Sequence, residues 1–79
     1  MQSYLTRHDP DRNMARFYAL EVAPDLFGGV VLLRHWGRIG GKGRTCRQWF
    51  ETSAEAWAEA AQWQARKERR GYAAVAAPS

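Results

Sequence analysis

The residues best able to do chemistry lie in the middle third of the chain, residues 26–50. This stretch contains five cations and no Asp or Glu, and it accounts for the positive excess of the whole sequence. Cations without counter-charges favour a surface that binds a polyanion, most often nucleic acid. An ordinary solvated face whose arginines make scattered hydrogen bonds is an equal alternative on charge alone. The five cations are Arg34, Arg38, Lys42, Arg44 and Arg47.

Trp36 lies within this basic stretch and is followed by Gly37 and Arg38. An exposed indole offers a flat apolar face to a sugar or a base, and neighbouring arginines can bind phosphate through two parallel hydrogen bonds. Gly37 lets another chain come close to the backbone. Burial is the usual fate of indoles, so a structural Trp36 stays open as the alternative. The pattern slightly favours contact with nucleic acid.

Other kinds of site fit this sequence poorly. The four glycines between residues 37 and 43 lack the spacing of a phosphate-binding loop, and a hairpin turn explains them. Cys46 has no general base nearby in the sequence, and the Ser and Thr residues form no recognisable triad. The two His residues and Cys46 are not clustered as zinc ligands are. We therefore expect no catalytic residues, no metal, no cofactor and no small-molecule substrate.

The elements that must position these residues can be predicted from residue patterns. Strands are expected at residues 4–8, 16–22, 30–36 and 44–50. A helix over residues 53–70 is expected because Thr52 and Glu55 match a capping box and no Gly or Pro interrupts the segment. Gly71 would end that helix. The order predicts an α+β fold, a small antiparallel sheet of about four strands with one long C-terminal helix packed on one face.

The same pass predicts which side chains face the core. Tyr18, Leu20 and Val22 share one face of their strand. In the next strand we expect Val31 and Leu33 in the core and Trp36 outward with its arginines. Trp57 and Trp63 of the helix are expected in the core. A single domain over residues 1–72 and a flexible tail over residues 73–79 are predicted.

The cellular compartment follows from what the sequence lacks. Cys46 is the single cysteine, so no intramolecular disulfide can form and a reducing compartment is expected. The first residues lack the apolar core of a signal peptide. The longest apolar run, residues 30–33, cannot span a bilayer. We therefore expect a cytoplasmic protein without a membrane partner.

The segment Trp36-Gly37-Arg38-Ile39-Gly40 resembles the signature of the WGR domain family. The chain as a whole resembles the small stand-alone bacterial members of that family. The resemblance extends over residues 13–72, with Arg16-Phe17-Tyr18 similar to the family's entry strand and Gly71-Tyr72 similar to the ending of bacterial members. It implies the fold described above. In poly(ADP-ribose) polymerases such domains help to recognise DNA breaks. The 79 residues contain no transferase domain and no zinc finger, so the resemblance implies no catalysis.

The resemblance also implies roles for single residues. The family's Trp packs on the sugar at a strand end, which would be Trp36 here. The family's Arg, here Arg38, bridges DNA to a neighbouring domain, and Gly37 is the small residue that makes room. We therefore predict a non-enzymatic domain that binds DNA, at nicks or strand ends, through Trp36, Gly37 and Arg38, with Arg34, Lys42, Arg44 and Arg47 added from charge. The alternative is a protein-interaction module or small subunit that docks an acidic partner.

Overall fold

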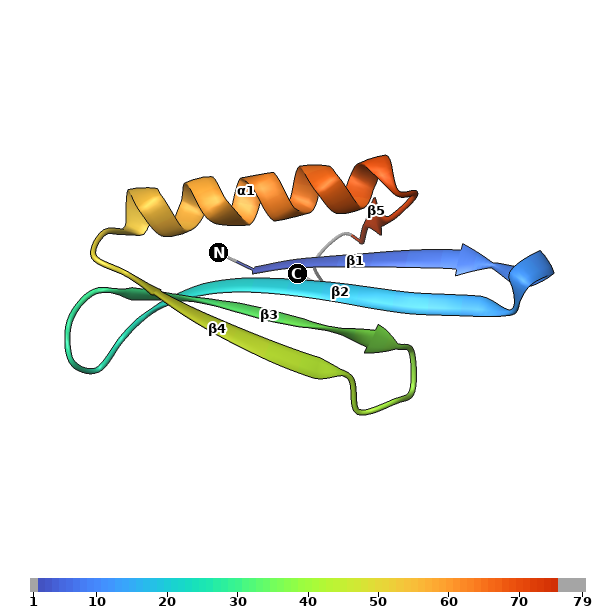
Figure 1. Ribbon diagram of the computed structural model, residues 1–79, viewed down its shortest axis with the longest axis horizontal. Helices are drawn as coiled ribbons and strands as arrows, with labels where there is room; N and C mark the ends of the chain where they lie inside the picture. The colour runs from blue at the N-terminus through green and yellow to red at the C-terminus, as the bar shows by residue number, and fades with distance from the viewer. Residues whose placement is uncertain (1, 76–79) are drawn as a thin grey trace.

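The computed structural model describes residues 2–75, which form one antiparallel sheet and one long helix (Figure 1). The strand order in the sheet is β4-β3-β2-β1-β5. In chain order the elements are β1 (Gln2–Asp9), the short 3-10 helix η1 (Pro10–Arg12), β2 (Met14–Pro24), β3 (Val30–Arg38), β4 (Arg44–Phe50), α1 (Ser53–Arg69) and β5 (Ala73–Ala74). The predicted α+β fold is confirmed.

The sheet has a fifth strand that the sequence does not predict. Ala73 and Ala74 pair with Thr6 and Leu5 of β1, and Val75 N donates to Tyr4 O at 2.8 Å. The flexible tail predicted over residues 73–79 thus begins with two residues that belong to the sheet, and residues 76–79 lie outside the described part of the chain. Two alanines carry no strand signal of their own. They pair because the end of α1 brings them alongside β1.

Both ends of α1 are closed by specific hydrogen bonds. At the start, Glu55 N donates to Thr52 Oγ1 at 3.3 Å, as the capping box predicts. At the end, Gly71 N donates to Glu68 O and Tyr72 N donates to Lys67 O, each at 3.0 Å. This pair of bonds is a Schellman motif, with Gly71 at a φ of +96°. The reversal turns Tyr72 back toward the sheet, where its ring meets that of Tyr18 at 6.5 Å.

The core lies between the sheet and α1. Leu5, Tyr18, Leu20 and Leu32 are buried beneath the helix, which approaches closely because Ala56 and Ala60 are small and fully buried. Trp63 packs against this cluster as predicted. Trp57, predicted in the core, is 48% exposed, so that prediction is wrong.

The register corrects which face of β3 is covered by the helix. Val22 lies opposite Leu32, Leu20 opposite Arg34 and Tyr18 opposite Trp36, so these residues share the helix-facing side of the sheet. The prediction that Leu33 faces the core and Trp36 faces away from it is therefore wrong. Since residues 30–33 are apolar on both faces, alternation there carries no information on direction.

The opposite face of the sheet has no helix over it and is closed by its own side chains. Tyr4 stacks on Phe17 at 5.9 Å, and His35 meets the same ring edge-on at 5.1 Å. Phe17 is buried between them. Val31, opposite Trp49 on β4, is also buried on this side.

A candidate nucleic-acid interface

A groove lies at one end of the molecule, where the helix-facing side of the sheet extends past the end of α1. Its volume is about 600 Å³, and we call it the basic groove. Trp36, Tyr72 and Met14 supply its larger apolar side chains. Five cations line it: Arg12, Arg16, Arg38, Arg44 and Lys67. The arrangement combines apolar rings with positive charge at one place.

Strand register brings these cations together. Arg16 lies two residues before Tyr18 and directly opposite Arg38, and Trp36 lies directly opposite Arg44. Because residues two apart in a strand share a face, all of these side chains continue the row that carries the core. The helix contributes Lys67 from its last turn. Residues from four separate segments therefore meet at one groove.

Most of the cations in the basic groove have no carboxylate partner. Within residues 2–75 the ion pairs are Arg12 with Asp9 at 3.6 Å and Arg47 with Asp25 at 3.3 Å. Of the groove cations, Arg12 alone takes part in one of them. The other four repel one another across a partly desolvated space, and this repulsion favours the entry of an anion.

Trp36 forms a wall of the groove and is half-buried. Its ring stacks on that of Tyr18 at 6.0 Å, with an interplanar angle of 24°, and packs against the core cluster. The sequence left open whether the Trp36 indole is exposed or buried, and the structure shows an indole that is partly buried. Core packing on one side fixes the ring while the other side lines the groove.

Arg34 lies behind Trp36 rather than in the groove. Its guanidinium carbon is 4.0 Å from the Trp63 ring centroid and 5.5 Å from that of Trp36. Nη1 donates to the Tyr18 hydroxyl at 3.3 Å and Nη2 donates to Cys46 Sγ at 3.1 Å. These contacts hold the guanidinium between two indoles. The structure thus places Arg34, predicted as a nucleic-acid contact, against the indoles of Trp36 and Trp63 and outside the lining of the basic groove.

Burial raises the pKa of the Tyr18 phenol, although the neighbouring Arg34 guanidinium acts in the opposite direction. Tyr18 therefore accepts the hydrogen bond from Arg34 as a neutral phenol at physiological pH. Nε of Arg34 is buried and has no partner among the described residues. The guanidinium is held mainly by its flat faces and by its two terminal nitrogens.

Lys67 lies in the groove between two aromatic rings and close to other cations. Its Nζ lies 4.8 Å from the centroid of the Tyr18 ring and 5.6 Å from that of Tyr72. Burial lowers the pKa of Lys67, and the positive charges of Arg70, Arg34 and Arg16 lower it further. An anion bound beside Nζ would reverse that effect by stabilising the ammonium.

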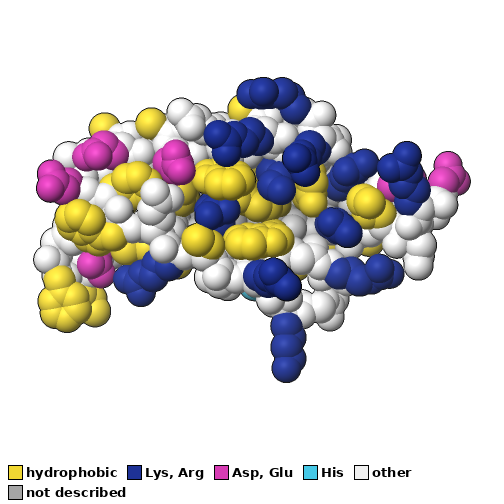
Figure 2. Space-filling model, in the orientation of Figure 1, with side chains coloured by type: hydrophobic (Ala, Val, Ile, Leu, Met, Phe, Trp, Pro, Cys, Tyr) yellow, Lys and Arg dark blue, Asp and Glu magenta, His cyan; other side chains and the backbone are white. Residues whose placement is uncertain are grey.

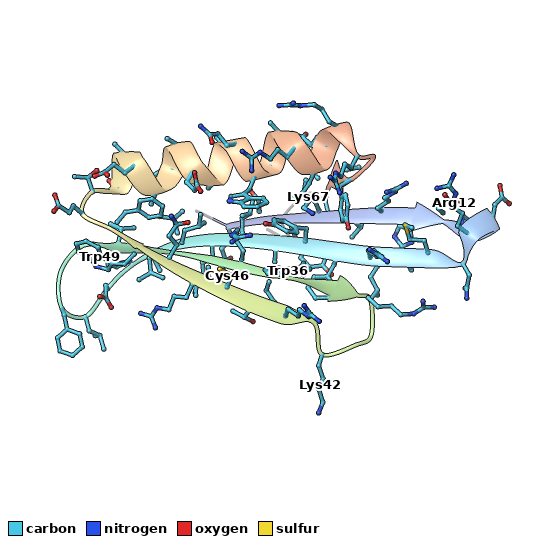
Figure 3. The ribbon with its side chains drawn as sticks, viewed as in Figure 1. Arg12, Trp36, Lys42, Cys46, Trp49 and Lys67 are labelled. Atoms are coloured by element: carbon cyan, nitrogen blue, oxygen red, sulfur yellow. The ribbon has the colours of Figure 1, made fainter. Side chains whose placement is uncertain are left out.

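On the face of the molecule that Figure 2 shows, charge is divided along the long axis. Figure 2 shows Lys and Arg side chains gathered on the half that contains the end of α1, with most Asp and Glu at the other end. Figure 3 shows Trp36 and Lys67 in the space between the sheet and the C-terminal half of α1. The basic groove is thus the centre of a wider positive region.

Comparison with known proteins identifies the family. A family model of the WGR domain matches residues 1–78. The chain belongs to the WGR family. It is 45% identical over 69 residues to an uncharacterized protein, y4dW, of Sinorhizobium fredii (strain NBRC 101917 / NGR234). The match covers 87% of this chain and 34% of the relative, so the chain spans about a third of that protein. No solved structure matches it.

WGR domains are in general non-catalytic nucleic-acid-binding modules of proteins related to poly(ADP-ribose) polymerases. Among residues 2–75 of this member no group of three or more His, Cys, Asp or Glu side chains could hold a metal ion. No helix in the described part of the chain is both long enough and apolar enough to cross a membrane.

The signature residues of this WGR domain lie at the groove. Trp36, Gly37 and Arg38 all line it, together with Arg44. A Cβ on Gly37 would lie 2.6 Å from the Cα of Gly43, so the turn before β4 lies too close to β3 for any side chain there. The structure therefore gives Gly37 an internal reason, the close approach of its own chain.

Two of the predicted contacts lie elsewhere on this WGR domain. Lys42 is exposed in the β3–β4 turn, where its carbonyl accepts from His35 Nε2 at 2.9 Å. Its side chain extends away from the helix (Figure 3). Arg47 pairs with Asp25 on the face opposite the groove, near the turn between β2 and β3. Neither lines the groove.

The site residues predicted from the sequence do not include four residues that line the groove, Arg12, Arg16, Lys67 and Tyr72. A signal existed for two of them. Arg16 alternates with Tyr18 on the same strand face, and Lys67 shares a helix face with Trp63. Both lie outside the acid-free stretch. In their own segments nearby Asp and Glu residues cancel their charge in a local sum, so net charge does not single them out.

Proposed function

We propose that this WGR domain is a non-enzymatic module that binds DNA in the basic groove, at a nick or strand end. The observation that carries the proposal is the set of groove cations around Trp36, of which only Arg12 has a carboxylate partner in the described residues. A phosphodiester backbone supplies the missing negative charge. Trp36 offers an apolar face to a sugar or a base of the same strand.

Each residue has a distinct task in this proposal. Arg38 and Arg44 flank Trp36 and contact phosphate oxygens through paired N–H donors. Lys67 approaches from the helix as a point charge. Arg34 and Tyr18 keep the indole fixed. Because every groove cation contacts the phosphate backbone of the DNA in this proposal, we expect little discrimination between DNA sequences.

A titration of labelled DNA tests the proposal. Three duplexes of one sequence, one with both ends closed by hairpin loops, one closed but nicked and one blunt-ended, are titrated at a low and a moderate salt concentration, with single-stranded RNA as a further ligand. Binding should be tightest to the duplexes with a strand end and should weaken steeply with salt. Trp36→Ala should cost about 1–3 kcal/mol of binding free energy through lost stacking, and Arg38→Ala on the order of tenfold in affinity.

Lys42→Ala is the matched control, because it removes a cation of the acid-free stretch that lies outside the groove. Circular dichroism establishes that each variant is folded. Equal binding to all three duplexes with no effect of Trp36→Ala would contradict recognition of strand ends. Absence of binding to every nucleic acid at low salt, with binding to a polyglutamate peptide, would replace the proposal by docking of an acidic protein partner.

A further inference from the structure

The turn between β2 and β3 presents two large apolar side chains to solvent. Leu26 is 95% exposed and Phe27 is 94% exposed. We call this turn, residues 25–29, the apolar tip. It lies at the end of the long axis opposite η1, which contributes Arg12 to the basic groove (Figure 1). Large adjacent apolar side chains at such exposure mark an interaction site.

The apolar tip is a built structure. Asp25 N donates to Gly29 O at 3.1 Å, Gly28 N donates to Asp25 O at 3.3 Å, and Leu26 N donates to Asp25 Oδ1 at 2.9 Å. Strand β4 braces the turn from the side, since Trp49 Nε1 donates to Gly28 O at 3.0 Å and Arg47 pairs with Asp25. Ordering the turn in advance reduces the conformational entropy that the turn itself would lose when a partner binds it.

The end of the molecule that carries the tip is acidic. Residues 20–30 and 46–60 contain five of the eight acids of the protein and a single cation, Arg47, whose charge Asp25 already balances. The acids are Glu21, Asp25, Glu51, Glu55 and Glu59. Figure 2 shows this acidic end beside projecting hydrophobic side chains. A surface that accepts the tip should therefore combine apolar side chains with positive charge.

The basic groove has that composition. It offers Trp36, Tyr72 and Met14 to apolar side chains, and cations to carboxylates. Its volume of about 600 Å³ allows entry of aliphatic and aromatic side chains. The tip cannot reach the groove of its own molecule, because the two lie at opposite ends of a body 45 Å long. The matching groove must belong to a second copy.

We propose that copies of this domain associate head to tail, with the apolar tip of one seated in the basic groove of the next. Such a contact joins two different surfaces, so repeated copies build a ring or an open filament rather than a two-fold dimer. A tip-to-tip pair would bring two acidic ends together and is disfavoured. The association depends on tip and groove alone, so it can succeed or fail independently of DNA binding. Where DNA occupies the groove, it excludes the tip.

Sedimentation equilibrium on the wild-type domain over micromolar to millimolar concentrations measures the association. At low salt the weight-average mass should rise above 9.0 kDa with concentration, and at high salt it should return toward that value. Two blocked variants separate the surfaces. Leu26→Ser with Phe27→Ser removes the tip, and Arg38→Glu with Arg44→Glu reverses charge in the groove. Each variant alone should remain monomeric.

Mixing the two blocked variants is the decisive arm, because one retains a working groove and the other a working tip. A head-to-tail contact predicts a complex of one copy of each, with about twice the monomer mass. The tip substitutions change fully exposed side chains, so that variant should retain its fold. A wild-type protein that is monomeric at every concentration would overturn the proposal. So would self-association of the groove-blocked variant alone, or a mixture that forms no complex.

Discussion

At the scale of single residues, the arginines of one acid-free stretch have different tasks. Arg34 lies between the indoles of Trp36 and Trp63 and donates to Tyr18 and Cys46. Arg47, thirteen positions along, has its guanidinium on Asp25 at the surface. A count of charged residues does not distinguish Arg34 from Arg47, because both add one positive charge to the same stretch. What separates them is the group beside each guanidinium, which is two indole rings and a hydroxyl for Arg34 and a carboxylate for Arg47.

Replacing Arg34 should therefore act mainly by lowering the free energy of unfolding rather than by removing a positive charge from the surface. Arg34→Ala removes the contacts with both indoles and leaves the Tyr18 hydroxyl without its donor, so we expect a loss of about 1–3 kcal/mol in the free energy of unfolding. Arg47→Ala, at an exposed ion pair, should change it by no more than about 0.5–1 kcal/mol. Urea unfolding followed by tryptophan fluorescence measures both. Equal effects of the two substitutions would contradict the positioning role of Arg34.

At the scale of elements, the end of α1 decides the shape of the groove. The Schellman motif at Gly71 reverses the chain and brings Tyr72 against Tyr18, while the last helical turn places Lys67 over the same ring. The helix thus contributes to the site only through how it ends. The same reversal delivers Ala73 and Ala74 to the edge of β1.

Gly71→Ala should weaken both the fold and the site. Gly71 has a φ of +96°, so alanine there should cost about 1 kcal/mol of stability and should displace Tyr72 from the groove. Gly40→Ala is the matched control, because Gly40 has a φ of +89° and open space around it. Thermal unfolding should show similar losses for both. DNA affinity should fall for Gly71→Ala alone, and an equal fall for Gly40→Ala would mean that strain rather than Tyr72 is responsible.

Much of the element list could be predicted from the sequence, and the reasons are local. Alternation marks β2 and β4, and Thr52, Glu55 and Gly71 mark the ends of α1. Which face of β3 lies under the helix could not be predicted, since its first four residues are apolar on both faces. Trp57 was misplaced because Ala56 and Ala60 form the buried face of α1, and Trp57, next to Ala56, lies about 100° around the helix from it.

The candidate site could be predicted only in part. Trp36, Gly37, Arg38 and Arg44 are neighbours on one hairpin, so a motif reveals them. Arg16 and Lys67 come from distant segments, and only strand register and helix packing bring them to the same groove. The cytoplasmic location expected from the sequence stays a prediction.

At the scale of the whole molecule, two unlike ends share one rigid sheet. One end holds the basic groove and the other the acidic surroundings of the apolar tip (Figure 2). This polarity supports both proposals, in which the domain binds an anionic strand at one end and offers an anionic, apolar contact at the other. Both proposals follow from the same segregation of charge, but they use different surfaces.

The salt dependence of DNA binding tests the central claim most directly, because it counts the phosphates that the groove neutralises. The slope of log K against log salt should be close to −0.9 for each phosphate contact on duplex DNA. Arg44→Ala should make that slope shallower by about 0.9 and lower the affinity, whereas Arg47→Ala should leave both unchanged. Equal slopes for the two variants, or a change with Arg47→Ala alone, would show that the DNA lies outside the basic groove.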